Sequence, residues 1–153
     1  MTAPSTPEAG ALALDSGTVR IGLAAADPGG TLATPVAVLD AGRADQLWAR
    51  VREEAVARRS QVLVVGLPLR LDGSEGDAAA RARRLAAEAR TRTDLDVELW
   101  DERLSSVEAE RALIAQGMRR ERRRRTSDAV AAAIVLQAWL DAHRSRRARG
   151  RTS

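Results

Sequence analysis

Hydrophobic and polar positions divide the chain into short apolar runs and longer amphipathic stretches. The first half opens with three short apolar runs bounded by turn-forming residues, and these predict three strands in a meander: 11–15, 21–26 and 34–40. Between residues 43 and 59, Leu47, Val51 and Ala55 recur at a spacing of four, which predicts a helix. Residues 61–65 are almost continuously apolar, which is typical of a central strand buried on both faces.

The second half alternates helical and strand patterns. Residues 77–91 predict a helix rich in Ala and Arg, and residues 97–100 predict a strand. Ser105 or Ser106 suits the start of a helix over 107–116, and Gly117 suits its end. Three leading strands followed by alternating helices and strands predict an α/β domain with a mixed sheet.

The last helix is predicted from the polar group Thr126, Ser127 and Asp128, which suits a helix start, to about His143. The arginine run at 119–125 then becomes a loop between two helices. Outside this framework, residues 1–10 are expected to form a disordered tail, residues 11–143 one domain, and residues 144–153 an arginine-rich tail. We expect neither tail to be structured.

Composition narrows the chemistry. The chain of 153 residues has no cysteine and one histidine, which argues against a zinc site or a thiol nucleophile. It has no apolar stretch near the roughly 20 residues of a membrane span, and its first residues lack a signal-peptide pattern. We therefore expect a cytoplasmic protein with no membrane partner. The three Trp are expected in the core rather than as platforms for bases.

Charge is concentrated at two places. All 25 basic residues are Arg, with six in the run 119–125 and five in residues 144–153. Clustered arginine is the pattern expected of a contact with a nucleic-acid backbone. We select Arg122, Arg123 and Arg124 as backbone-binding candidates. A solvated loop and a solvated tail remain the alternatives.

Three acids stand at the edges of apolar segments and carry the candidate chemistry: Asp15 at the tip of the first strand, Glu102 after the strand at 97–100, and Asp128 at the start of the last helix. Carboxylates are the ligands that Mg²⁺ prefers, and paired Mg²⁺ or Mn²⁺ ions support phosphodiester hydrolysis. Simpler roles stay open. Asp15 can accept bonds from the turn that follows it, Glu102 can pair with an arginine, and Asp128 can serve as a helix cap.

Four motifs in order resemble the YqgF/RuvX family. The first is Asp15-x-Gly17-Thr18-x-Arg20-Ile21-Gly22, with Ser16 where the family often has proline or tyrosine. The others are residues 66–68 with 72–76, residues 101–105, and the helix beginning at Asp128. The resemblance spans about residues 11–140. It implies a ribonuclease H-like mixed five-stranded sheet flanked by helices. It also implies a metal-dependent nuclease that acts on structured RNA and processes the 5′ end of precursor 16S rRNA.

The resemblance also implies that Asp15, Glu102 and Asp128 are the catalytic and metal-binding residues. Arg20 and Arg103 flank these acids and are candidates to bind a scissile phosphate, because guanidinium binds phosphate oxygens in a bidentate fashion. A structural ion pair is the alternative for each.

Other functions remain open. One is a Holliday junction resolvase acting on branched DNA, which would call for a homodimer, and another is an RNA-binding factor without catalysis. The first motif also resembles the opening of actin-like ATPases, which need a second similar half that 153 residues without a repeat do not provide.

Overall fold

The structure is a computed structural model that describes residues 10–105 and 120–151, and within 120–127 and 145–151 it describes the backbone alone. Its strands are β1 (Ala11–Ser16), β2 (Arg20–Ala26), β3 (Ala33–Asp40), β4 (Val62–Leu67) and β5 (Asp96–Asp101). Its helices are α1 (Ala44–Arg58), α2 (Asp77–Arg92), the short 3₁₀ helix η2 (Glu102–Leu104) and α4 (Arg120–Arg151). The helix predicted over 107–116 lies outside the described residues.

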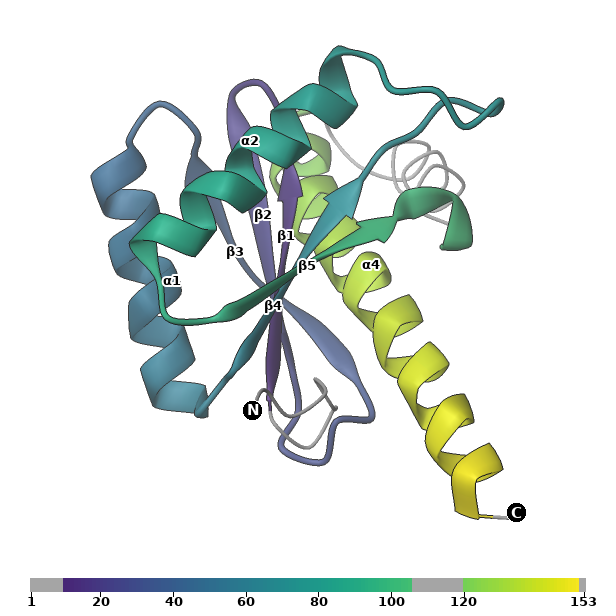
Figure 1. Cartoon of the computed structure of the whole chain (residues 1–153). Helices are drawn as coiled ribbons and strands as arrows, with labels where there is room; N and C mark the ends of the chain where they lie inside the picture. The colour runs from purple at the N-terminus through teal and green to yellow at the C-terminus, as the bar shows by residue number, and fades with distance from the viewer. Residues whose placement is uncertain (1–9, 106–119, 152–153) are drawn as a thin grey trace.

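All five strands form one mixed sheet in the order β3-β2-β1-β4-β5 (Figure 1). The first three strands pair antiparallel as the predicted meander. β4 and β5 are parallel to β1, because α1 and α2 each return the chain to the start of the sheet. The prediction of a mixed five-stranded sheet flanked by helices is thereby confirmed, and it puts the carboxyl ends of β1, β4 and β5 at one edge.

The sheet separates two hydrophobic clusters. On one face, Leu12 and Leu14 of β1 pack with the buried sides of α1 and α2. On the other face, Ala11 and Ala13 pack with α4, which Figure 1 shows to be the helix that covers this side among the described residues. The alternation along β1 therefore assigns large side chains to the two-helix face and small ones to the α4 face. Small side chains let the backbone of α4 approach the sheet closely.

The tryptophans lie in the core, as expected. Trp48 and Trp139 are almost completely buried, and Trp100 packs at the edge of the α4 cluster. The indole N–H of Trp48 donates to Glu88 at 2.8 Å, and that of Trp139 donates to Glu98 at 2.6 Å. These two buried rings thus each keep a polar partner for their one donor.

The arginine run at 119–125 was predicted as a loop, and this prediction is wrong for its described residues, 120–125. α4 already includes Arg120 and runs without interruption through residue 128, so the polar group at 126–128 does not begin the helix. The run contains no Gly or Pro, and Arg is a good helix former, so nothing local stops the helix there.

The same helix continues to Arg151, so the expectation that residues 144–153 are unstructured is also wrong for most of that segment (Figure 1). Arginines near a helix C-terminus interact favourably with the helix dipole. Among the described residues, no helix is both long enough and apolar enough to span a membrane.

Candidate active site

Asp15 lies in a row of three residues that crosses the centre of the sheet. In the antiparallel register it faces Gly22 of β2. The parallel register pairs Leu14 with Val65, so one residue further Gly66 of β4 lies beside Asp15. The row is therefore glycine, aspartate, glycine, on the face that α4 covers. The two glycines add no side chains of their own beside the carboxylate, so other groups can come close to the sheet there.

Gly22 brings the backbone of α4 onto this row. A β-carbon placed on Gly22 would lie 1.9 Å from the carbonyl oxygen of Asp128 and 2.9 Å from the nitrogen of Ala129. No other residue type fits at this position without moving the helix. Asp128 is thereby held against the strand position directly opposite Asp15.

Gly66 receives Glu102 on the other side of the row. A β-carbon on Gly66 would lie 2.6 Å from Oε1 of Glu102 and 3.2 Å from a methyl group of Val135. The carboxylate of Glu102 thus lies over β4, next to Asp15. The structure therefore brings all three predicted acids to one patch of the sheet, with Asp15 in the middle.

Asp15 is the one charged residue that is buried in the described part of the chain, with 4% of its surface exposed. Burying a carboxylate is costly, so such a residue usually serves a purpose beyond stability. The oxygen donors gathered here are the type that Mg²⁺ or Mn²⁺ takes, and Mg²⁺ commonly needs only one or two protein carboxylates. Within the described residues, no three His, Cys, Asp or Glu side chains are already arranged as a metal cage.

The position of Glu102 is set by a tight turn at the end of β5. Asp101 caps η2, its Oδ1 accepting the backbone N–H of Arg103 at 2.9 Å. Its carboxylate also binds the Arg103 guanidinium, with the shortest contact at 2.7 Å. The hydrogen bond from the Arg103 side chain holds the pKa of Asp101 below its ordinary value. Arg103 is thus paired with a motif acid, which matches the structural alternative to its proposed phosphate contact.

Arg20 lies at the edge of the sheet where the acids are found, and its proposed phosphate contact stays a prediction. It begins β2, pairs in register with Asp40 of β3, and shares a sheet face with Gly22 two residues later. It therefore lies on the α4 face, at the same edge as the acids. The side chains of Arg122, Arg123 and Arg124 are outside the described part of the chain, although their helical backbone lies just before Asp128.

Comparison with known proteins gives the family. A model of the RuvX family, described as "Holliday junction resolvase", matches residues 9–142. The chain belongs to the RuvX family. A relative from Kineococcus radiotolerans named "Putative pre-16S rRNA nuclease" is 49% identical over 143 residues, which are 92% of this chain and 76% of the relative. A relative of the same name from Nitrobacter hamburgensis is 44% identical, covering 88% of this chain and 83% of its own.

Solved structures give the fold of this RuvX-family chain. The Thermus thermophilus RuvC structure superposes with a TM-score of 0.55 at 18% identity, covering 89% of this chain and 96% of RuvC. RuvC from the same organism in complex with a Holliday junction substrate gives a TM-score of 0.53 at 16% identity, covering 87% and 94% of the two chains. The fold is therefore the ribonuclease H-like fold of RuvC, as the sequence motifs implied.

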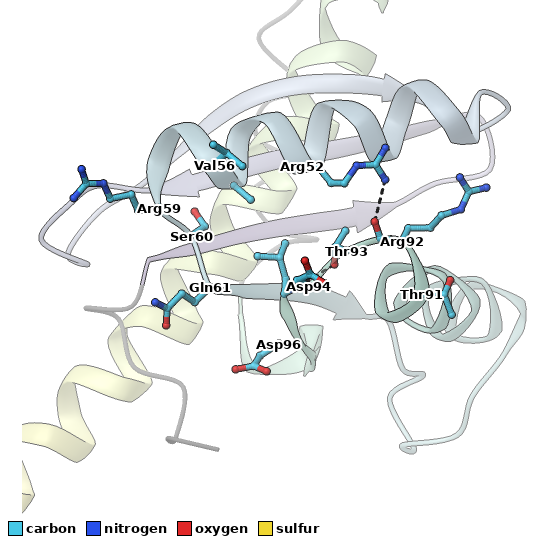
Figure 2. Close-up of a pocket in the computed structure, with 12 residues that line it drawn as sticks. Arg52, Val56, Arg59, Ser60, Gln61, Thr91, Arg92, Thr93, Asp94 and Asp96 are labelled. Carbon is cyan, nitrogen blue, oxygen red and sulfur yellow. Dashed lines mark hydrogen bonds between the residues drawn. The ribbon is translucent and has the colours of Figure 1, made fainter. Parts of the chain in front are cut away.

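A large hollow lies away from the acids of this RuvX-family domain. Its volume is about 590 Å³, and it is lined by the C-terminal turns of α1 and α2 and by the segments that lead into β4 and β5 (Figure 2). These are the starts of the strands, whereas Asp15 and Glu102 lie at strand ends. Figure 2 shows Arg52 donating across it to the carbonyl of Arg92, at 2.9 Å. None of the three predicted acids lines it.

Sequence reasoning does not single out three contributors to the site. The two glycines of the row enter it only as parts of motifs, and Asp101 enters only as the neighbour of Glu102. A signal for Asp101 does exist, because an acid two residues before an arginine at a strand end is well placed to cap a turn. The close approaches at Gly22 and Gly66 depend on tertiary packing, which one sequence does not display.

Proposed function

We propose that this protein is a metal-dependent nuclease that hydrolyses phosphodiester bonds in the cytoplasm, processing the 5′ end of precursor 16S rRNA. The observation that carries the proposal is the glycine–aspartate–glycine row, in which buried Asp15 lies between the carboxylate of Glu102 and the helical turn of Asp128. The names of the curated relatives favour this substrate.

Each acid has a distinct task in this proposal. Asp15 is fixed by two neighbouring strands, so its carboxylate does not need to reorganise when substrate arrives. Glu102 approaches from a capped turn, and Asp128 from a helix pressed onto the sheet. Together they would hold Mg²⁺ or Mn²⁺, which when bound lowers the pKa of water and stabilises charge on phosphate oxygens.

The glycines serve the acids, and Arg20 serves the substrate. Gly22 and Gly66 carry no side chain, so the α4 backbone at Asp128 and the carboxylate of Glu102 can lie against the sheet on either side of Asp15. Arg20 lies on the same face and is the cation that we expect to orient the reacting phosphate through paired hydrogen bonds. We expect Arg103 to contribute mainly through the turn that holds Glu102, since its guanidinium is bound to Asp101.

The test compares two substrates side by side. End-labelled precursor 16S rRNA and a four-way DNA junction are incubated with the purified protein in Mg²⁺, Mn²⁺ or EDTA. We expect cleavage of the RNA near the mature 5′ end with either metal and none in EDTA. Cleavage that persists in EDTA, or no cleavage of any precursor RNA, would overturn the proposal.

Branched DNA is the second candidate substrate. The description of the family model and the fold shared with RuvC favour it. A resolvase makes two symmetric cuts, which calls for a homodimer on a two-fold substrate. Paired junction cuts by a dimeric species, with precursor RNA left intact, would favour this function. A purely RNA-binding factor fits less well, because a buried carboxylate facing phosphate would only weaken its binding.

A further inference from the structure

The loop after β4 is held by its own polar groups. The N–H of Gly73 donates to the carbonyl of Arg70 at 2.8 Å, and the N–H of Arg70 donates to the carbonyl of Ser74 at 3.0 Å. The carboxylate of Asp72 accepts from both the N–H and the hydroxyl of Ser74, at 2.9 and 2.6 Å. Gly73 has φ +87°, a backbone conformation that glycine adopts without strain. The loop is therefore a closed turn with Leu71 at its apex.

The guanidinium groups of two exposed arginines lie against this loop. The guanidinium of Arg70 fills the space beside Gly76, where a β-carbon would lie 2.7 Å from its Nη2. That of Arg103 lies 3.5 Å from the β-carbon position of Gly73, which joins the loop to the turn holding Glu102. The polar side chains thus build the loop, while its one apolar residue at the apex, Leu71, is 96% exposed.

A second exposed leucine stands on the adjoining turn. Leu104 is 63% exposed and directly follows Arg103. We call Leu71 and Leu104 the leucine rim. Single exposed apolar residues are common and need no explanation. Here two occur on turns that Arg103 joins, both held by hydrogen bonds. The two turns follow β4, which carries Gly66, and β5, which leads into Glu102.

We propose that the leucine rim packs against the base faces of unpaired nucleotides that flank the scissile phosphate, so that the protein selects a single-stranded segment. The inference rests on the proposed nuclease function and adds the class of substrate. Bases in a duplex are stacked on one another, whereas unpaired bases present apolar faces. Aromatic side chains usually provide this contact, but Trp48 and Trp139 are buried in the core. Arg70, an exposed arginine next to Leu71, supplies positive charge of the kind that a phosphate chain requires.

The test measures binding in EDTA, where no cleavage occurs. The double variant Leu71→Ser with Leu104→Ser is titrated against labelled single-stranded RNA and against a blunt RNA duplex of the same sequence. We expect affinity for the single strand to fall about tenfold, the loss expected when two partly covered leucines are removed from an interface. Affinity for the duplex should change less than about twofold.

Leu32→Ser is the matched control. Leu32 is 55% exposed and lies in the turn between β2 and β3, at the opposite end of the sheet. It should leave both affinities unchanged. Thermal unfolding of the rim variant should match that of the wild type, because both leucines are largely solvent-exposed.

The outcomes separate this inference from the proposed function. An equal loss of affinity for single-stranded and duplex RNA, or no loss for either, would overturn the proposed role of the leucine rim. A change from dimer to monomer by size-exclusion chromatography, with RNA affinity unchanged, would also overturn it and assign the rim to an interface between copies. A further outcome is that the wild type binds single-stranded RNA more tightly than duplex, loses that preference in the double variant, and yet cleaves no RNA. That result would support the role of the leucine rim and refute the proposed nuclease function.

Discussion

The two ends of the central sheet differ in a way that bears on where chemistry takes place. Where β1, β4 and β5 end, the backbone of α4 and the side chain of Glu102 press against two glycines, around a buried carboxylate. Where β4 and β5 begin, the ends of α1 and α2 leave a hollow of about 590 Å³. Three arginines line it, and Asp15, Glu102 and Asp128 do not. A hollow of that size suits a small ligand. None of the three predicted acids lines the hollow, so the strand ends remain the candidate site for chemistry on a nucleic acid.

A second contrast lies within the row itself. At Gly22 the obstacle to a side chain is backbone of α4, which moves only with the whole helix. At Gly66 it is the end of the Glu102 side chain, which can turn away. The two glycines therefore have different structural roles. Gly22 lets α4 pack close enough to place Asp128, and Gly66 leaves room for the carboxylate of Glu102. The following predictions test the difference between the two ends and between the two glycines.

The largest effect is expected from Asp15→Asn. The amide keeps the shape of the side chain but loses the charge that would hold a divalent ion. Cleavage should fall by about a thousandfold or more, equivalent to about 4 kcal/mol. The matched control is Asp94→Asn in the hollow, which should retain wild-type rates. Similar rates for the two variants, measured by single-turnover cleavage, would remove the distinction between the two ends of the sheet.

Gly22→Ala should come next. The added methyl group would collide with the carbonyl of Asp128, so α4 must shift. Overpacking of this kind typically lowers the free energy of unfolding by about 1–3 kcal/mol. Urea denaturation measures the free energy of unfolding, with Gly29→Ala in an open turn as the control.

Gly66→Ala should lower the free energy of unfolding less than Gly22→Ala but still reduce cleavage, because the added methyl group displaces Glu102. A stability loss at Gly66 larger than at Gly22 would contradict the contrast between them.

Asp101→Asn should have a moderate effect. Losing the charge that binds Arg103 loosens the turn of Glu102, and changes in such supporting residues typically cost about 10–100-fold in metal affinity or activity. Mn²⁺ affinity, measured by titration without substrate, should weaken along with cleavage. Unchanged Mn²⁺ affinity would mean that the turn does not position Glu102.

The pH dependence of stability tests the same ion pair. Because Arg103 lowers the pKa of Asp101 in the folded protein, the ionised group stabilises the fold above its unfolded pKa. That contribution is lost as the pH falls through the lower, folded pKa. The difference in unfolding free energy between wild type and Asp101→Asn should therefore be constant near neutral pH and shrink below about pH 4. A difference that persists in acid would exclude the ion pair as its source.

The smallest effect on turnover is expected from replacing Arg122, Arg123 and Arg124 with Ala. If this helical segment binds phosphates, each arginine that no longer neutralises a phosphate should reduce the salt dependence of binding by about one unit of slope, whatever the RNA sequence. Turnover at saturating RNA should change far less than in Asp15→Asn. Binding isotherms over a range of salt concentrations measure the slope. An unchanged slope would assign these arginines to solvent.

Much of the fold could be predicted because local pattern and tertiary structure agree. The repeat of Leu47, Val51 and Ala55 marks the buried side of α1, and the apolar run of β4 marks a strand covered on both faces. The arginine run misleads because Thr126 and Ser127 look like a helix start, whereas no breaker separates them from the arginines before them. Local signals for a cap are outweighed when the preceding residues also favour helix.

The acids were predictable as candidates, because strand ends and helix starts are where the polar residues of such a sheet gather. Their convergence was not, because it depends on what lies over Gly22 and Gly66. A single sequence does not show why a position lacks a side chain. Whether a glycine serves a turn, a bulge or a close approach is decided by a segment about a hundred residues away in the case of Asp128. The roles of the three acids stay predictions until the variants are measured.

The late place of α4 in the chain has a consequence for synthesis. Every strand in the described part of the chain is complete by Asp101. The face carrying Ala11, Ala13, Val62 and Val64 is covered by α4, which is made later. The second core and the seat of Asp128 can therefore form only once α4 has been made. If the three acids are catalytic, a chain that lacks α4 is inactive. A nuclease for ribosomal RNA would thereby stay silent until α4 has packed against the sheet.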